Sequence, residues 1–276
     1  MSSDPDFDAQ PPESPQPIEP SDSIEPAVPR KRSPIMIIAV VLGLLVLGLL
    51  LSGGILTALL MPAVTTTRSA SRQAESANNL KQIGLALLNY HEAYEAFPPA
   101  YTTDEDGQPL LSWRVLILPF MQQSILHEQF VLEEPWDSPN NRSLLQYMPP
   151  VFGSPRYDQP ENSNETNYVT IRSEDSVFPG DRSIRIRDVI DGTTLTVAVV
   201  EMKETGIPWT RPDDVTPQQA YAAIAGSKGS TEGTNILLSD GSVRQVDGQL
   251  TQSEFEAMVT RRGGETIAAD TPQPAE

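Results

Sequence analysis

Hydrophobic and polar positions divide the 276-residue chain into a polar stretch, one long apolar run and a mixed remainder. The apolar run extends from Ile35 to Leu60, holds no charged residue, and is interrupted by Ser52, Thr57 and four glycines. A helix of about 26 residues is roughly 39 Å long, which exceeds the hydrocarbon core of a bilayer at about 30 Å. The pattern therefore predicts a transmembrane helix over residues 34–63. A buried core helix is the alternative, but core helices are seldom so long and so uniformly apolar.

The polar stretch before this run, residues 1–33, contains eight prolines, seven acidic side chains and almost no large apolar ones. Such a segment cannot bury enough apolar surface to offset the entropy of ordering, so a disordered tail is expected. Arg30, Lys31 and Arg32 lie beside the apolar run, and clustered positive charge favours the cytoplasmic side of a membrane. We therefore expect a cytoplasmic N-terminus and an extracytoplasmic segment 64–276. A cleaved signal peptide is the alternative, disfavoured by the length of the run and by the long acidic tail.

A helical pattern resumes after the apolar run. Apolar residues recur every three or four positions at Ala70, Ala74, Ala77, Leu80, Ile83, Leu87 and Tyr94. Most polar side chains of this segment fall on the opposite side, and Phe97-Pro98-Pro99 ends it. The segment is therefore predicted to be a helix with one packed face.

The remainder has the pattern of short strands, turns and short helices. Residues 184–189 and 194–201 flank Asp191-Gly192, residues 235–238 and 242–246 flank Asp240-Gly241, and each Asp-Gly pair predicts a hairpin. Further expected elements are a strand at 167–171, a buried strand or helix start at 113–118, a helix at 122–132, and a helix opened by a capping box at 251–254. The predicted fold is α+β, with a long N-terminal helix against an antiparallel sheet with long loops in residues 64–265. Residues 266–276 are expected to form a second disordered tail.

Charge and composition exclude several classes of protein. The formal net charge is −18, which argues against nucleic-acid binding because nucleic acids require a basic face. The chain has no cysteine, so it contains neither a disulfide framework nor a thiolate zinc site.

Candidate catalytic chemistry is sparse. The two histidines, His91 and His127, are expected to be packing or surface residues, since neither has a partner at metal-ligand spacing. No GxSxG, SxxK or HExxH motif occurs. Residues 104–107, from Asp104 to Gly107, offer spaced carboxylates but lack the later bidentate acid of a calcium loop, so a solvated turn is favoured over a calcium site. We expect no enzyme activity, no metal and no cofactor.

Three tryptophans, Trp113, Trp136 and Trp209, provide the strongest candidates for ligand contact. Their more frequent role is to anchor a core, which we favour here because aromatic residues make up 6% of the chain. A binding interpretation would have them stack on sugars or peptides, with nearby carboxylates and amides as polar partners. The candidate contact residues for a ligand or partner are Trp136, Asp137, Asn140, Asn141 and Trp209, with Glu201 as a further polar group.

Nine motifs then follow one another in a fixed order. They are MPAV at 61–64, NNLKQIGLALLNYHEAY at 78–94, FPPAY at 97–101, LSWRVLILPF at 111–120, EPWDSPNN at 134–141, TNY at 166–168, IDGTTLTVAVVE at 190–201, PWTRPDD at 208–214 and NILLSDGSVR at 235–244. Together they resemble a large planctomycete-type family of pilin-like proteins of unknown function, some of which are filed as extracellular solute-binding proteins. The resemblance covers residues 55–265. It implies a first helix similar to a type IV pilin stem, half in the membrane and half packed on a sheet.

The sequence departs from that family at two places. Val40, Val41 and Leu45 stand where typical members have a cleavage glycine, a phenylalanine and a glutamate. Ser230 stands where they have a histidine, ten residues before the Asp of an Asp-Gly pair. The resemblance with these departures implies a permanent single-span anchor rather than a filament subunit.

The sequence thus predicts a single-pass protein of a bacterial inner membrane with a structural or interaction role at the cell envelope. Its expected partners are the membrane and other envelope or pseudopilin-like proteins. The alternative is a membrane-tethered module that binds glycans or other solutes. Buried tryptophans favour the first function, and several tryptophans on a concave surface would favour the second.

Overall fold

A computed structural model describes residues 34–160, 163–227 and 233–264, leaving out the side chains of residues 50–67. The chain divides into two compact units, residues 1–59 and 60–276. The two predicted tails and Ser230 lie outside the described residues. The predicted boundary between the span and the outer domain, at residues 63 and 64, falls where side chains are not described.

The first unit contains the beginning of helix α1 (Pro34–Tyr94). Twelve large apolar side chains between Ile35 and Leu49 are each at least 51% exposed, so they surround the helix rather than forming one face. Residues 50–60 of the predicted span lie outside the part of the chain whose side chains are described. A search of the described residues finds no helix of the length and apolarity that a membrane crossing requires.

The second unit contains the C-terminal portion of α1. Leu80, Ile83 and Leu87 are buried there, whereas Lys81 and Leu85 between them are exposed. The helical spacing that the sequence showed therefore places these three side chains on one packed face, as predicted.

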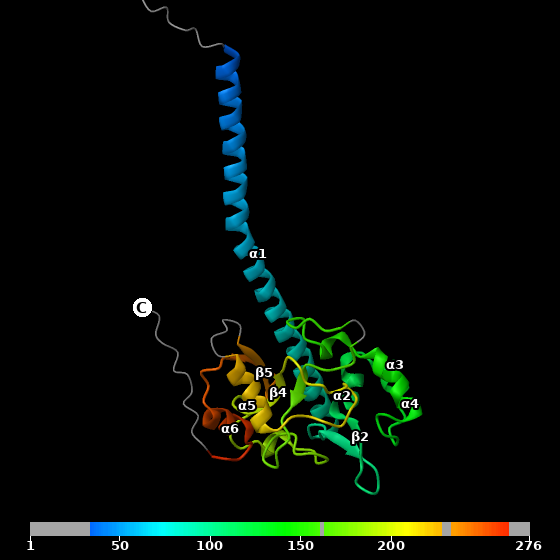
Figure 1. Ribbon diagram of the computed structural model, residues 1–276. Coiled ribbons are helices and arrows are strands. Elements are labelled where there is room, and N and C mark those ends of the chain that lie inside the picture. The colour runs from blue at the N-terminus through cyan, green and yellow to red at the C-terminus, as the bar shows by residue number, and fades with distance from the viewer. Residues whose placement is uncertain (1–33, 161–162, 228–232, 265–276) are drawn as a thin grey trace, which may run out of the picture. The chain divides into compact units, whose positions relative to one another are not determined.

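That face packs on a four-stranded antiparallel sheet with the order β3-β4-β5-β6. Figure 1 labels its two central strands, β4 and β5. The strands are β3 (Tyr168–Thr170), β4 (Val197–Glu201), β5 (Thr234–Leu238) and β6 (Val243–Val246). Asp240-Gly241 connects β5 to β6, which confirms the second predicted hairpin. The α+β class is confirmed as well.

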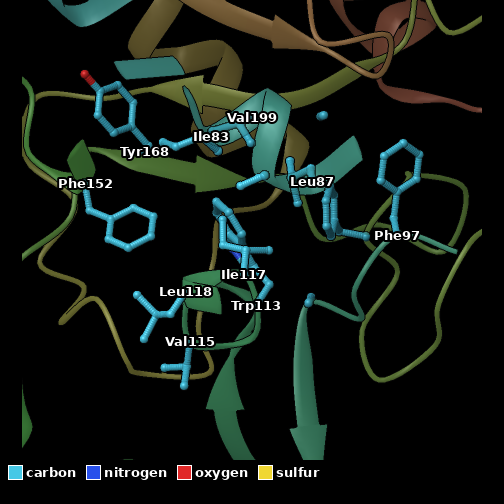
Figure 2. Packing of buried hydrophobic residues seen from close by; sticks show 14 of the residues in the cluster. Ile83, Leu87, Phe97, Trp113, Val115, Ile117, Leu118, Phe152, Tyr168 and Val199 are labelled. Atoms are coloured by element: carbon cyan, nitrogen blue, oxygen red, sulfur yellow. The ribbon is translucent and has the colours of Figure 1, made fainter. Parts of the chain in front are cut away.

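Each side of the sheet has its own buried cluster. On one side, Ile83 and Leu87 of α1 pack with Val199 of β4 and with Trp113, as Figure 2 shows. On the other side, Ile236 of β5 packs with apolar side chains of α5 (Pro217–Gly226) and α6 (Gln252–Val259). The predicted capping box opens α6, since Thr251 and Glu254 bond each other's backbone N–H. The sheet is therefore covered on both sides, which explains why β3, β4 and β5 are buried along their whole length.

The hairpin predicted at Asp191-Gly192 is wrong. Only residues 197–201 of the second run form a strand among the described residues, and the first run contains a 3₁₀ turn, η4 (Ile186–Asp188). The Asp191 carboxylate accepts hydrogen bonds from the backbone N–H groups of Gly263 and Gly264, at 2.7 and 3.0 Å. Asp191 thus serves as an anchor for the segment after α6, and β4 finds its partners in β3 and β5 instead.

A second hairpin, unpredicted, surrounds the turn from Asp104 to Gly107. It pairs β1 (Tyr101–Thr103) with β2 (Pro109–Ser112), and the Asp104 carboxylate accepts from the backbone N–H groups of Asp106 and Gln108. The remaining elements are α2 (Trp113–Leu116), η1 (Leu118–Met121), α3 (Ser124–His127), α4 (Pro139–Arg142), η2 (Ser143–Tyr147) and η3 (Pro150–Phe152). Residues 113–118 thus begin a helix, and the helix predicted at 122–132 is one turn long.

A buried ion pair ties α2 to β3. The Arg114 guanidinium donates to Asp214 Oδ1 at 2.6 Å and to the Tyr168 carbonyl at 2.9 Å, and both charged side chains are inaccessible to solvent. Burial lowers the pKa of Arg114 and raises that of Asp214, while the opposite charge of each partner counteracts both shifts. Because each charge is compensated by the other and by hydrogen bonds, the pair is tolerated inside the domain.

A candidate ligand-binding cleft beside α1

A cleft of about 490 Å³ opens between α1 and residues 149–159. Glu75, Asn79 and Gln82 of α1 form one wall, because a spacing of four and then three residues places them on the same side of the helix. Met121 and Gln123 close one part of the cleft. Its volume falls within the roughly 300–1,000 Å³ typical of ligand pockets.

The opposite wall is a loop held in place by prolines and hydrogen bonds. Pro149, Pro150 and Pro155 restrict its backbone, and η3 lies within it. Asn79 Nδ2 donates to the Gly153 carbonyl at 3.1 Å, so the helix wall holds the loop directly. The cleft is therefore formed before any ligand arrives.

Behind the loop lies a buried carboxylate, Glu201, at the end of β4. It is 1% exposed and accepts hydrogen bonds from the hydroxyls of Ser76, at 2.7 Å, and of Ser154. Arg156 donates to its other oxygen at 2.9 Å, and the Asn235 backbone N–H lies 3.4 Å from that oxygen. Glu201 thus joins helix, loop and sheet, and Ser154 is the member of this polar cluster that also lines the cleft.

Tyr168 extends the same cluster. Its hydroxyl lies 3.0 Å from Ser76 Oγ, and burial raises the pKa of Tyr168 to about 12, with the Glu201 charge adding to the rise and the Ser76 hydrogen bond opposing it. Asn235 Nδ2 also donates to Ser76 Oγ, at 3.2 Å. Ser76 of α1 therefore bonds one residue in each of three strands of the sheet, Tyr168 of β3, Glu201 of β4 and Asn235 of β5.

The chemistry of the lining is that of hydrogen-bond recognition. Among the described residues that line the cleft, none is lysine, arginine, histidine or cysteine, and Glu75 is the one acid. The two histidines lie elsewhere: His91 Nε2 accepts from the Ile186 backbone N–H at 3.1 Å, and partial burial lowers the pKa of His127. In the described part of the chain, no three His, Cys, Asp or Glu side chains come close enough to hold a metal ion.

A comparison with protein-family models gives one match, over residues 65–232, to the family described as "Protein of unknown function (DUF1559)" and labelled SBP_bac_10. The chain belongs to the DUF1559 family. This confirms the resemblance that the nine motifs indicated, and the match includes every residue that lines the cleft. No curated protein and no solved structure matches the chain significantly.

The site predicted from the sequence of this DUF1559 protein lies partly in one loop. Trp136, Asp137, Asn140 and Asn141 are close in sequence, with Trp136 half-buried and Asp137 and Asn140 exposed. The Asn141 amide is used internally, since it bonds the backbone at residues 131, 134 and 135. Contact between this loop and a ligand stays a prediction.

Trp209 is separate from that loop. It is completely buried, its indole N–H donates to the Leu145 carbonyl at 3.0 Å, and its ring stacks on Phe152 with centroids 5.9 Å apart. Trp113 is completely buried as well. Two of the three tryptophans therefore act as core anchors in this structure.

Sequence reasoning did not find the cleft residues. The sequence pattern places Asn79 and Gln82 on the polar side of the helix. Nothing near them in sequence indicates that residues 149–159 form the opposite wall of the cleft. Glu201 was considered as a partner of tryptophan, whereas it bonds two serines and an arginine.

Proposed function

We propose that this DUF1559 protein is anchored by one span in the inner membrane of a bacterial cell and has a structural or interaction role at the envelope, without catalysis. The observation that carries this proposal is the uncharged apolar run from Ile35 to Leu60, whose described large side chains are exposed all around the helix. Exposed apolar surface on every side of a helix favours a lipid surrounding over water. The charges of Arg30, Lys31 and Arg32 support a cytoplasmic N-terminus.

The pilin-like part of the proposal rests on the second unit. There one face of α1 packs on an antiparallel sheet through Leu80, Ile83 and Leu87, which is the arrangement that a pilin-like stem requires. Val41 and Leu45 at the positions of the family's phenylalanine and glutamate support a permanent anchor over a processed filament subunit. The partners we propose are envelope proteins, pseudopilin-like ones included.

Protease accessibility tests the topology. Proteinase K, which cleaves without a requirement for lysine or arginine, is added to spheroplasts that express the full chain and should digest residues 64–276 while leaving the N-terminal tail intact. The chain should also stay with the membrane in alkaline carbonate. Digestion of the tail with protection of the remainder, or release of the whole chain by carbonate, would overturn the proposal.

A matched pair of variants tests the anchor itself. Val41→Arg combined with Leu45→Arg should release much of the chain from the membrane, since an arginine at the centre of a span costs about 2.5–3.5 kcal/mol and Leu45 lies near that centre. Val41→Leu combined with Leu45→Ile keeps the run apolar and should leave the chain in the membrane.

The second candidate function is solute binding by a tethered domain. The cleft beside α1 favours it, because the loop wall is rigid and the lining is rich in hydrogen-bonding side chains.

A further inference from the structure

Two glutamines face the cleft with unused hydrogen-bonding capacity. Gln82 is exposed and Gln123 is half-buried, and among the described residues neither carboxamide has a hydrogen-bond partner. Each carboxamide offers two donors and one acceptor oxygen. Adjacent hydroxyl groups of a sugar both donate and accept, so a carboxamide can bond such a pair at once.

The loop wall adds a rigid apolar surface. The Arg156 guanidinium lies over the Tyr157 ring, 5.6 Å from its centroid, and is itself held by Glu201 and by the Gly233 carbonyl. The contact with Arg156 orients the ring, and Tyr157 and Pro155 both line the cleft. Oriented rings of this kind suit the C–H faces of a pyranose, and a wall that is already ordered reduces the entropy lost on binding.

The charge of the cleft selects against ions. No lysine or arginine belongs to the described lining, and Glu75 adds one negative charge. A phosphate, a sulfate or an acidic sugar would therefore meet no cationic side chain in the lining itself, since nearby Arg156 is bound by Glu201 and Arg72 lies 3.6 Å from Asp158, and a lone carboxylate does not hold a metal ion. A neutral ligand fits this lining.

A group of aromatic rings lies further along α1, outside the residues that line the cleft. Tyr90 and Tyr94 follow Gln82 on α1 by eight and twelve residues. Phe120 directly precedes the lining residue Met121. The rings form one group, with Tyr90 and Tyr94 each within 6.2 Å of Phe120, and Tyr94 is exposed. From Gln82 to Tyr90 the helix rises about 12 Å and turns by about 80°, so a ligand that reached both would have to be an extended chain of units.

We propose that the cleft beside α1 binds consecutive neutral sugar units of a glycan chain, with Gln82 and Gln123 bonding hydroxyl groups and Tyr157 packing against a sugar face. The proposal rests on the second candidate function and does not depend on the membrane span. The topology experiment and a binding experiment can therefore fail independently.

Calorimetric titration of the full chain tests this assignment. The chain is purified in a detergent without a sugar head group, because such a head group would compete. The probes are neutral trisaccharides of glucose, mannose, galactose and N-acetylglucosamine, and a proline-rich decapeptide. At least one trisaccharide is expected to bind with a dissociation constant below about 1 mM.

Matched variants locate the binding. Gln82→Ala combined with Gln123→Ala should weaken trisaccharide binding about tenfold or more, since it removes two sets of hydrogen bonds. Gln218→Ala, at an exposed glutamine of α5 outside the cleft, should bind as the unchanged protein does. All three proteins should melt at the same temperature, because none of these carboxamides has a bonding role in the described structure.

Three results would overturn the assignment: no trisaccharide binding up to about 10 mM, equal binding by the cleft variant and the control, or binding of the decapeptide alone. The last result would assign the cleft to extended peptides instead.

Discussion

Replacing Leu87 by alanine tests whether α1 is held by its packing on the sheet. Leu87 is 2% exposed and lies in the cluster that contains Val199 and Trp113. Truncation of a buried leucine costs about 2–5 kcal/mol, which combines the lost burial with the cavity left behind. A domain of this size loses about 2–4 °C of melting temperature per kcal/mol, so we expect a fall of roughly 6–12 °C for a cost near 3 kcal/mol.

The same helix supplies a matched control. Leu85 is 60% exposed, and Leu85→Ala removes the same atoms from the surface of the helix. Its effect should be within about 0.5 kcal/mol, because alanine is also the better helix former. Thermal unfolding of the full chain, followed by the fluorescence of the buried tryptophans, measures both variants. If Leu87→Ala and Leu85→Ala melt together, α1 is not held by the sheet and the pilin-like arrangement is wrong.

Three further predictions concern other parts of the domain. Tyr168→Phe removes the hydrogen bond with Ser76 and should cost about 1 kcal/mol at neutral pH. Because the folded-state pKa of Tyr168 is about 12 and the unfolded value about 10, the native protein should lose up to about 2.7 kcal/mol as pH rises from 10 to 12. Urea unfolding at several pH values should show that loss, and the phenylalanine variant should show a smaller one. Gly84→Ala would place a methyl group 2.8 Å from Leu237 Cδ1. The cost of overpacking, about 1–3 kcal/mol, should outweigh the gain in helix propensity of about 1 kcal/mol. A variant that melts at a higher temperature than the native protein would contradict this packing. Thr251→Ala removes the N-cap of α6 and should lower stability by about 1 kcal/mol in the same urea assay, whereas an unchanged midpoint would show that the cap is dispensable.

Local signals in the sequence predicted much of the fold. The periodic burial of Leu80, Ile83 and Leu87, the turn at Asp240-Gly241 and the capping box before α6 each depend on residues close in sequence, and all three are confirmed. The hairpin prediction at Asp191-Gly192 failed because the local pattern fits a hairpin and the observed turn equally well. The structure of this turn depends on the hydrogen bonds that the Asp191 carboxylate accepts from the backbone of residues 263 and 264, which lie more than seventy positions away.

The cleft could not be predicted for the same reason. Asn79 bonds Gly153, which lies 74 positions away in the sequence. The position of Gln82 on its helix does not indicate which residues form the opposite wall of the cleft. The core-anchoring role favoured for the tryptophans is confirmed for Trp113 and Trp209, which are completely buried, so Trp209 is not available as the ligand contact that it was a candidate for. The glutamines, which carry the capacity for recognition, have no pattern that distinguishes them from an ordinary polar helix surface.

The junction at Ser76 has a consequence for how the domain is made. Asn235, which bonds Ser76, follows it by 159 positions. At about 5–20 residues per second, a ribosome completes that interval in roughly 8–32 seconds. During that time the apolar face of α1 has been synthesised but β5, which helps to cover it, has not. The newborn domain therefore exposes this face until its C-terminal part emerges, which places completion of the native fold late in synthesis.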